Sequence, residues 1–291
     1  MIEYLYTLVY NQRMIIGIYT NHNKDNNHVI TSKLVSIIEA FGAKSIVFDD
    51  ESGDERNYSY LISASDVLIV LGGDGTILRV SKIASSVKLP VLGINLGRLG
   101  FLTEVESDAL ESVIKALIEG KYTVEERGML AVTAKNGEYL VLNEAMVGRY
   151  SHKMVNTELY IDAKFFHSYH ADGLIVSTPT GSTAYSLSAG GPVLDPALNA
   201  MVLTTVCPHS LYNRPIVIPI TKSVMLKVAK GSHDSILMVD GEYKAQLTEG
   251  DEVKIKSAPM TARFVRLKEY NFFARLEEKL NTWSLRTEED Q

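Results

Sequence analysis

Apolar and polar residues follow an alternating pattern over roughly the first 120 residues of the chain. Unbroken apolar runs predict buried strands at 14–19, 45–48, 67–71 and 90–94. Apolar residues spaced three and four positions apart predict helices over 31–41, 76–84 and 107–119. Ser107 is placed to cap the third helix and Gly120 to end it. Strands that alternate with helices through short links indicate a parallel α/β sheet with helices on both faces.

Beyond about residue 122 the pattern changes to short apolar segments separated by glycine, proline, aspartate or lysine. Asn136-Gly137 lies between 123–134 and 138–147, which predicts a hairpin with a tight turn. Eight further segments are candidate strands, at 157–162, 174–177, 202–207, 215–218, 223–228, 236–239, 252–257 and 262–267. Many short strands of this kind are typical of a β-sandwich. A last helix is predicted over 271–280, where the apolar residues share one face.

These patterns predict a chain of mixed class, α/β followed by all-β. The α/β domain is expected at 14–121, the β-sandwich domain at 122–268, and a C-terminal helix with a polar tail at 269–291. Residues 1–13 contain Glu3 and have neither the basic start nor the cleavage site of a signal peptide. We expect them to form an extension outside the fold, either disordered or upstream of the native start.

Charge and cysteine content narrow the class of protein further. The 29 basic and 35 acidic residues leave a formal charge of −6, and no run of lysine or arginine offers a surface for nucleic acid. The single cysteine, Cys207, excludes an intrachain disulfide and a zinc module built from several cysteines. No apolar run approaches the roughly 20 residues of a membrane span. The sequence therefore predicts a cytoplasmic protein with no nucleic-acid or membrane partner.

The segment Gly72-Gly73-Asp74-Gly75-Thr76 is the first with candidate chemistry. It joins a predicted strand to a predicted helix, and open α/β sheets bind ligands where their strands end. Glycines let the backbone approach a phosphate, and a helix start supplies free N–H groups. Because a bare carboxylate repels a polyphosphate, Asp74 is expected to act as a base on a hydroxyl or to help hold a metal. A simple turn is the alternative, since Gly-Asp-Gly is also a turn sequence.

Two further segments carry polar groups in unusual places. Asn143-Glu144 interrupts an apolar strand, which indicates either hydrogen bonds to a ribose or adenine, or a bulge or edge position. Residues 172–192 run from an apolar strand into a loop of small hydroxyl residues and glycine. Such a loop offers donors without bulk, and Tyr185 offers a ring on which a base can stack. A plain linker is the alternative, which the apolar strands on both sides disfavour.

In order and in spacing, these three segments resemble the motifs of the NAD kinase family, over about residues 14–280. Members of that family use ATP or polyphosphate to convert NAD to NADP. The run Thr-Gly-Ser-Thr-Ala-Tyr-Ser at 180–186 is highly specific, whereas diacylglycerol, sphingosine and 6-phosphofructokinases also carry Gly-Gly-Asp-Gly loops. A lipid or sphingoid-base kinase and a non-catalytic NAD-binding sensor remain as alternatives. An intact Gly-Gly-Asp-Gly-Thr favours the enzyme over the sensor.

The resemblance implies a role for each matched residue. Asp74 resembles the catalytic base on the 2′-hydroxyl of the adenosine ribose, and Arg79 resembles a basic residue near phosphate. Asn143 and Glu144 resemble the pair that holds adenine and ribose, and Asp172 the residue at the nicotinamide end. The loop for the phosphate donor is expected to consist of Gly72, Gly73, Gly75 and Thr76, of which Gly75 also lines the NAD site.

The remaining matched residues are expected to line the NAD site. They are His170, Thr180, Thr183, Ala184, Tyr185, Ser188 and Asp240. Asp240 belongs to a late Asp-Gly motif, in which many members carry an amide at the position of Glu242. The resemblance further implies a C-terminal segment that packs back on the α/β domain, and a homodimer or homotetramer whose subunits share the NAD site. It also implies Mg²⁺ or another divalent cation that accompanies ATP, and we expect no metal site built from protein residues.

Overall fold

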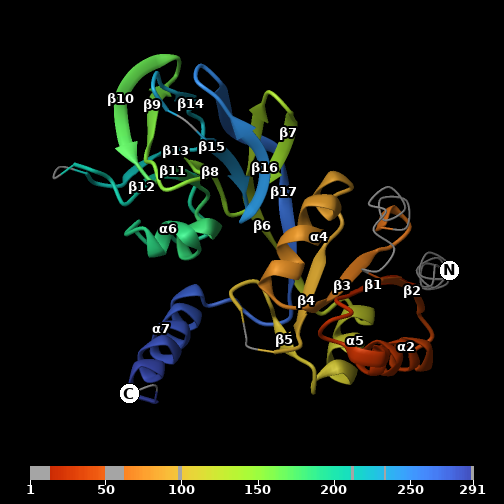
Figure 1. Cartoon of the computed structure of the whole chain (residues 1–291). Helices are drawn as coiled ribbons and strands as arrows, with labels where there is room; N and C mark the ends of the chain where they lie inside the picture. The colour runs from red at the N-terminus through yellow and green to blue at the C-terminus, as the bar shows by residue number, and fades with distance from the viewer. Residues whose placement is uncertain (1–13, 50–61, 98–99, 211–212, 233, 290–291) are drawn as a thin grey trace. The chain divides into compact units, whose positions relative to one another are not determined.

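The computed structural model describes residues 14–49, 62–97, 100–210, 213–232 and 234–289 (Figure 1). The chain divides into two compact units, one with residues 1–126 and 262–291 and the other with residues 127–261. We call them the α/β unit and the β unit. The predicted extension over residues 1–13 lies outside the described residues.

A parallel sheet forms the centre of the α/β unit. Its strands are β1 (Ile15–Thr20), β2 (Lys44–Asp49), β3 (Val67–Gly72), β4 (Val91–Asn95), β5 (Val105–Glu106) and the end of the long strand β17 (Glu252–Arg266). The order across the sheet is β2-β1-β3-β4, and β17 lies parallel to β4 with Phe264 opposite Val91. The helices of this unit are the 3₁₀ turn η1 (Asn26–His28), α2 (Val29–Ala40), α4 (Asp74–Ser86), α5 (Leu110–Ile118) and α7 (Phe272–Glu289).

The core of the α/β unit explains why β3 is an unbroken apolar run. Val67, Ile69 and Leu71 pack in one cluster with buried residues of α2 and α5. On the opposite face α4 lies so close to the sheet that a Cβ on Gly93 would overlap the side chain of Ile77. Because helices cover both faces, every residue of β3 is buried.

Two antiparallel sheets form the β unit. The first has the order β13-β12-β11-β8-β15-β16. Its strands are β8 (Glu144–Arg149), β11 (Gly173–Ser177), β12 (Ala200–Val206), β13 (Ile216–Pro219), β15 (Ser235–Val239) and β16 (Glu242–Leu247). In the second, β10, β9, β14 and β17 lie side by side, and β6 pairs with both β17 and β7. The new strands there are β6 (Thr123–Ala134), β7 (Gly137–Val141), β9 (Val155–Ile161), β10 (Lys164–Ala171) and β14 (Val224–Val228).

One apolar core lies inside the β unit. It joins residues such as Leu130 and Leu226 of one sheet to Leu174, Val176 and Leu237 of the other. Each sheet therefore turns one face to the core, which is the arrangement of a β-sandwich. The predicted fold class, an α/β sheet, a β-sandwich and a C-terminal helix, is confirmed. In the α/β unit the ring of Phe272, at the start of α7, lies 6.4 Å from the ring of Phe101.

The predicted hairpin forms, but its two-residue turn is Lys135-Asn136 because Gly137 pairs with Ala134, and its second arm is wrong. β6 and β7 pair with Leu130 opposite Val141, but β7 ends there. The chain then crosses into the other sheet, where β8 begins at Glu144. Asn143-Glu144 is therefore neither a bulge nor an edge within one strand, because it marks the point where the chain changes sheets.

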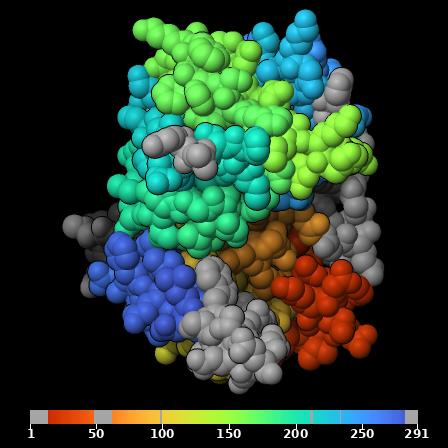
Figure 2. All heavy atoms as spheres, turned by 60° about the vertical axis from the view of Figure 1, so that its left-hand side comes forward, coloured from red at the N-terminus to blue at the C-terminus, as the bar shows by residue number. Residues whose placement is uncertain are grey.

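Strand β10 is absent from the sequence prediction. Its residues are exposed over nearly the whole strand, so they show no alternation of apolar and polar positions. Figure 1 shows β10 at the edge of its sheet, and Figure 2 shows the green spheres of this part of the chain at the surface. Asp162 and Ala163 join β9 to β10 with positive φ angles of 49° and 62°, the geometry of a tight hairpin turn. Strand β17 was expected as two strands, yet it runs without a break through Pro259.

Helix ends differ from the prediction by a few residues. Helix α4 begins at Asp74 rather than at residue 76, so the aspartate itself opens the first turn. Helix α5 begins at Leu110, and Ala109 occupies its N-cap position, so Ser107 is not its cap. Helix α7 continues to Glu289, beyond the predicted end at 280. In the part of the chain that the structure describes, no helix is long and apolar enough to cross a membrane.

Candidate functional site

The topology of the α/β unit defines where a ligand can bind. β1 connects through α2 to β2 on one side, and β3 connects through α4 to β4 on the other. Neighbouring strands whose connections leave in opposite directions create a crevice at their carboxyl ends, which is the usual ligand site of open α/β sheets. The loop from Gly72 to Thr76 starts at this edge.

Glycine is required in this loop because the backbone turns tightly. A Cβ on Gly72, the last residue of β3, would lie 2.6 Å from the hydroxyl of Thr76. Gly73 has an extended backbone and precedes the first turn of α4. The first N–H groups of a helix have no partner within the helix and carry its positive dipole end. This loop is therefore suited to phosphate oxygens.

The carboxylate of Asp74 is held in one orientation by the loop that follows β4. Its Oδ2 accepts a hydrogen bond from the backbone N–H of Phe101 at 2.7 Å, and its Oδ1 accepts one from Leu102 at 3.0 Å. The backbone approaches so closely that a Cβ on Gly100 would overlap the carboxylate. Each carboxylate oxygen has a second lone pair. Asp74 is half-buried and can accept a further proton donor, such as a ribose hydroxyl.

Arg79 lies on α4, just over one turn beyond Asp74. Its Nη2 donates to the hydroxyl of Tyr19 at 2.7 Å, and its guanidinium lies 5.7 Å from the centre of that ring. Thr76 is buried, and its hydroxyl accepts a hydrogen bond from the side-chain amide of Asn21 at 3.1 Å. Strand β1 and the loop after it therefore brace the first turns of α4.

Lys24 is a site residue that sequence reasoning missed. Lys24 follows β1 in a segment without a motif, and its side chain is exposed. Its Nζ, however, lies 2.7 Å from the position that a Cβ on Gly73 would take. The backbone N–H groups of Lys24 and Asp25 both donate to the carbonyl of Asn21, which fixes this turn beside the glycine loop. An ammonium group thus faces the candidate phosphate site, and only the tertiary structure reveals it.

Asp25 is structural. Its carboxylate is buried and accepts hydrogen bonds from the N–H of Ile30 and from the N–H and hydroxyl of Thr31. Burial raises the pKa of Asp25, but these hydrogen bonds, that of the Thr31 hydroxyl first, outweigh it and hold the pKa below 3.8. Asp25 therefore caps the start of α2 and anchors the turn that carries Lys24.

In the β unit, Asp240 holds the backbone of Asn143 and Glu144. Its Oδ1 accepts from the N–H groups of Asn143 at 2.7 Å and Glu144 at 3.1 Å, and its Oδ2 accepts from Leu142 at 3.1 Å. Asp240 lies at φ +48° in the turn between β15 and β16. Its carboxylate is thus committed to the point where the chain changes sheets.

The loop that begins at Thr178 packs on the same backbone. The N–H of Thr178 donates to the carbonyl of Asn143 at 2.8 Å. The Thr178 hydroxyl donates to the carbonyl of Leu142 at 2.5 Å. A Cβ on Gly181 would overlap the Asn143 carbonyl, so only glycine fits there. The Asn-Glu pair and the hydroxyl-rich loop, predicted separately, therefore form one site.

The expected adenine wall lies on two short helices after β11, η3 (Thr180–Thr183) and α6 (Tyr185–Ser188). Thr180 is buried, and its carbonyl accepts from the Thr183 hydroxyl at 3.2 Å. Ala184 is half-buried, whereas Tyr185 is 44% exposed and Ser188 is exposed. The ring of Tyr185 is therefore available for stacking on a base.

Asp172 and His170 lie at the other end of β11. Asp172 forms an ion pair with Arg149 at 3.1 Å. The Nδ1 of His170 lies 2.6 Å from Oδ1 of Asn156. Asp172 and Thr178 are six residues apart, which corresponds to about 20 Å along a β-strand. The β unit thus presents two separate groups of candidate residues along one strand.

In the α/β unit the structure brings the predicted residues together. Gly72, Gly73, Asp74, Gly75, Thr76 and Arg79 lie in one loop and the first turns of α4. Among the described residues, no group of three or more histidine, cysteine, aspartate and glutamate side chains is arranged to hold a metal ion. Glu242, at the position where many family members carry an amide, is exposed and forms an ion pair with Lys244 at 2.6 Å.

Fold and site together indicate a class, a nucleotide-binding protein whose α/β unit has a glycine loop suited to phosphate. Sequence models of the ATP-NAD kinase N-terminal and C-terminal domains match residues 59–122 and 142–267. An NAD kinase of Acetivibrio thermocellus is 38% identical over 278 residues, 91% of this chain and 96% of that protein. One of Moorella thermoacetica is 42% identical over 235 residues, 79% of this chain and 75% of that protein. The chain belongs to the NAD kinase family.

Two solved structures are similar over most of both chains. Yeast NADH kinase complexed with NADH aligns with a TM-score of 0.78 and 26% identity, over 91% of this chain and 86% of that one. An NAD kinase from Archaeoglobus fulgidus in complex with ATP aligns with a TM-score of 0.75 and 26% identity, over 92% and 99%. The family resemblance inferred from the three motifs is confirmed.

Proposed function

We propose that the protein transfers the terminal phosphate of ATP to the 2′-hydroxyl of the adenosine ribose of NAD, which yields NADP and ADP. Membership of the NAD kinase family supports this reaction. The observation that carries it is the carboxylate of Asp74, which lies at the start of α4 within the glycine loop and is held by two backbone N–H groups. A lipid kinase has no use for the hydroxyl-rich loop at 178–188.

Asp74 acts as the general base. The 2′-oxygen of the ribose attacks the terminal phosphorus, its proton passes to the Asp74 carboxylate, and the bond from that phosphorus to the ADP oxygen breaks. A positioned base of this kind contributes about 10²–10⁴ in rate. Alignment of the ribose with the phosphate supplies the other main part of the acceleration.

The donor phosphates are assigned to the loop of Gly72, Gly73, Gly75 and Thr76, with Lys24 as its cation. The first N–H groups of α4 and the ammonium of Lys24 beside Gly73 support this assignment. Mg²⁺ is assigned to the phosphates of ATP itself, where it neutralises their charge. Polyphosphate offers the same phosphate chemistry and is the alternative donor.

We assign the adenosine of NAD to the first group of β-unit residues and its nicotinamide end to the second. Asn143 and Glu144 are placed to hold adenine and ribose, and Asp172 and His170 the nicotinamide end. In the α/β unit, Gly75 and Arg79 are also assigned to NAD. Thr180, Thr183, Ala184, Tyr185 and Ser188 form the adenine wall. Asp240 acts through the backbone of Asn143 that it holds.

A coupled assay tests the reaction. Purified protein is given NAD, Mg²⁺ and either ATP or polyphosphate, and NADP is detected with an NADP-specific dehydrogenase. We expect NADP from the wild type, loss of nearly all activity in Asp74→Asn, and wild-type activity in Asp108→Asn, which removes an exposed carboxylate of the same unit. If no donor gives NADP while NAD still raises the melting temperature, the protein is an NAD-binding sensor.

Two further assignments have their own tests. A homodimer or homotetramer, the state implied by the family resemblance, is expected in light scattering. A cytoplasmic location is proposed on the single cysteine, which fits a reducing compartment, and fractionation of cells tests it.

A further inference from the structure

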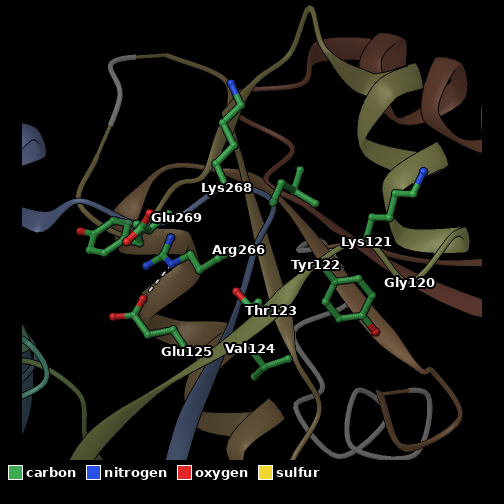
Figure 3. Close-up of a pocket in the computed structure, with 11 residues that line it drawn as sticks. Gly120, Lys121, Tyr122, Thr123, Val124, Glu125, Arg266, Lys268 and Glu269 are labelled. Atoms are coloured by element: carbon green, nitrogen blue, oxygen red, sulfur yellow. Dashed lines mark hydrogen bonds and ion pairs between the residues drawn. The ribbon is translucent and has the colours of Figure 1, made fainter.

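A charged cluster is buried in the α/β unit behind the loop that holds Asp74. Arg266, the last residue of β17, has a side chain only 2% exposed. Its Nη1 lies 2.8 Å from the carboxylate of Glu104, and its Nε lies 2.7 Å from that of Glu125. Figure 3 shows the guanidinium directed at Glu125, whereas Lys121 and Lys268 point away from it. The ring of Tyr270 covers the guanidinium at 4.0 Å.

This cluster does not belong to the glycine loop. Burial of the Arg266 cation with the Glu104 carboxylate, beside a half-buried Glu125, is unfavourable for stability alone. Removal of charges from water costs several kcal/mol per ion, and apolar residues of similar volume often stabilise as well. Buried ion pairs are therefore weak evidence for stability. In some proteins they instead fix one conformation.

The contacts of the cluster lead to the loop at 100–104. The Glu104 carboxylate binds Arg266 and also accepts the N–H of Leu267 at 3.0 Å. The N–H of Glu104 donates to the carbonyl of Gly93 on β4. The hydroxyl of Tyr270 donates to the carbonyl of Phe101 at 3.3 Å. The end of β17 and the segment after it therefore hold this loop at both Phe101 and Glu104.

Phe101 joins the cluster to the base. Its carbonyl accepts from Tyr270, while its N–H donates to Oδ2 of Asp74 at 2.7 Å. The next N–H, that of Leu102, donates to the other oxygen of Asp74. Displacement of the loop therefore moves both donors that orient the carboxylate. A shift of about 1 Å in a reacting group can reduce the rate about 10²-fold.

We propose that Arg266 and Tyr270 are positioning residues for Asp74, which act through Glu104 and Phe101. The proposal rests on the role of Asp74 as the base in the proposed function. It gives the end of β17 a role in the reaction that no motif of the sequence indicated. Loss of these contacts lowers kcat because the base is misaligned. It leaves KM nearly unchanged because no substrate-binding group of the protein is removed.

The test compares three conservative variants. Arg266→Lys keeps the charge but cannot bridge both carboxylates, and Tyr270→Phe keeps the ring but removes the hydroxyl. Arg263→Lys is the matched control, since Arg263 lies on the same strand and binds Glu126 and the Lys88 carbonyl instead. We expect kcat to fall about tenfold in the first two variants and less than about twofold in the control, with KM for NAD and ATP nearly constant.

A double-mutant cycle separates positioning from general stability. In the Asp74→Asn background the residual kcat no longer depends on the base, so Tyr270→Phe is expected to have no further effect. Equal fold-losses of kcat from Tyr270→Phe in the two backgrounds would overturn the proposal. So would wild-type kcat in both Arg266→Lys and Tyr270→Phe.

Hydrogen exchange gives a readout without activity. The amide protons of Phe101 and Leu102 are expected to exchange about tenfold faster in Tyr270→Phe and Arg266→Lys than in the wild type and Arg263→Lys. Unchanged exchange at both amides contradicts the proposal, whether or not the protein turns over NAD. If the wild type makes no NADP, the proposed function fails, while the exchange rates still decide whether the cluster holds the loop.

Discussion

The carboxylate of Asp240 accepts the backbone N–H of Asn143 at 2.7 Å, although 97 residues separate the two in the chain. The same oxygen accepts the N–H of Glu144. In the α/β unit, Asp74 binds the N–H groups of Phe101 and Leu102 in the same way. Two aspartates predicted as substrate contacts thus each hold a neighbouring segment of backbone.

Asp240→Asn tests the first of these arrangements. An amide has one acceptor oxygen in place of two, so three N–H groups compete for it. We expect the free energy of unfolding to fall by about 1–2 kcal/mol. We also expect KM for NAD to rise more than KM for ATP, because the Asn143 backbone loosens. Asp162→Asn is the control, since Asp162 also has a positive φ and binds a backbone N–H, in an exposed turn. Equal effects of the two substitutions would contradict this role for Asp240.

Gly100→Ala tests the close approach at Asp74. The added Cβ overlaps the Asp74 carboxylate, so the side chain or the loop must shift. We expect kcat to fall by about 10²-fold with little change in the melting temperature. Gly97→Ala serves as the control because its Cβ meets nothing within 4 Å. Steady-state kinetics on both variants is the measurement, and wild-type kcat in Gly100→Ala excludes the steric argument.

Lys24→Met tests the cation beside the glycine loop. Methionine keeps much of the length of the side chain and removes the charge. We expect KM for ATP to rise about tenfold, the equivalent of one charge-assisted hydrogen bond, while KM for NAD stays the same. Lys33→Met, which removes an exposed charge from α2, is expected to change neither constant. A rise in KM for NAD alone would show that Lys24 binds NAD and not ATP.

Asp25 makes stability depend on pH. Its hydrogen bonds favour the charged form in the folded state and keep its pKa below the ordinary 3.8. The stability it contributes is therefore complete above that value and is lost as the pH falls through the lower folded pKa. We expect Asp25→Asn to be less stable than the wild type by about 1 kcal/mol at neutral pH. Urea unfolding down to about pH 3 is expected to show this difference shrink, and a constant difference would contradict the sign.

Much of the fold could be predicted from local pattern. Buried strands such as β3 and amphipathic helices such as α2 carry their own periodicity, since each contacts the core along one or both faces. Strand β10 carries none, because it is exposed along nearly its whole length. The single strand β17 looked like two because residues 258–261 lack the apolar pattern of their neighbours.

Candidate site residues followed from chemistry that is local in sequence, and the rest did not. Gly-Gly-Asp-Gly-Thr and the 178–188 loop are contiguous, so their composition alone indicates a ligand. Lys24 and Arg266 lie in segments with no motif, and their positions beside Gly73 and Glu104 depend on how distant strands pair. No spacing rule connects residues 104 and 266.

By itself, the sequence determined the class of the fold, the family and the segments proposed to bind nucleotides, because periodicity and contiguous motifs are local properties. Only the tertiary structure decided what Asp74 and Asp240 hold, which loops meet, and which charges lie behind the loop that holds Asp74. Those contacts join residues from 27 to 162 positions apart. Such pairs are selected by the packing of whole strands and helices around a shared core, and no local pattern records that choice.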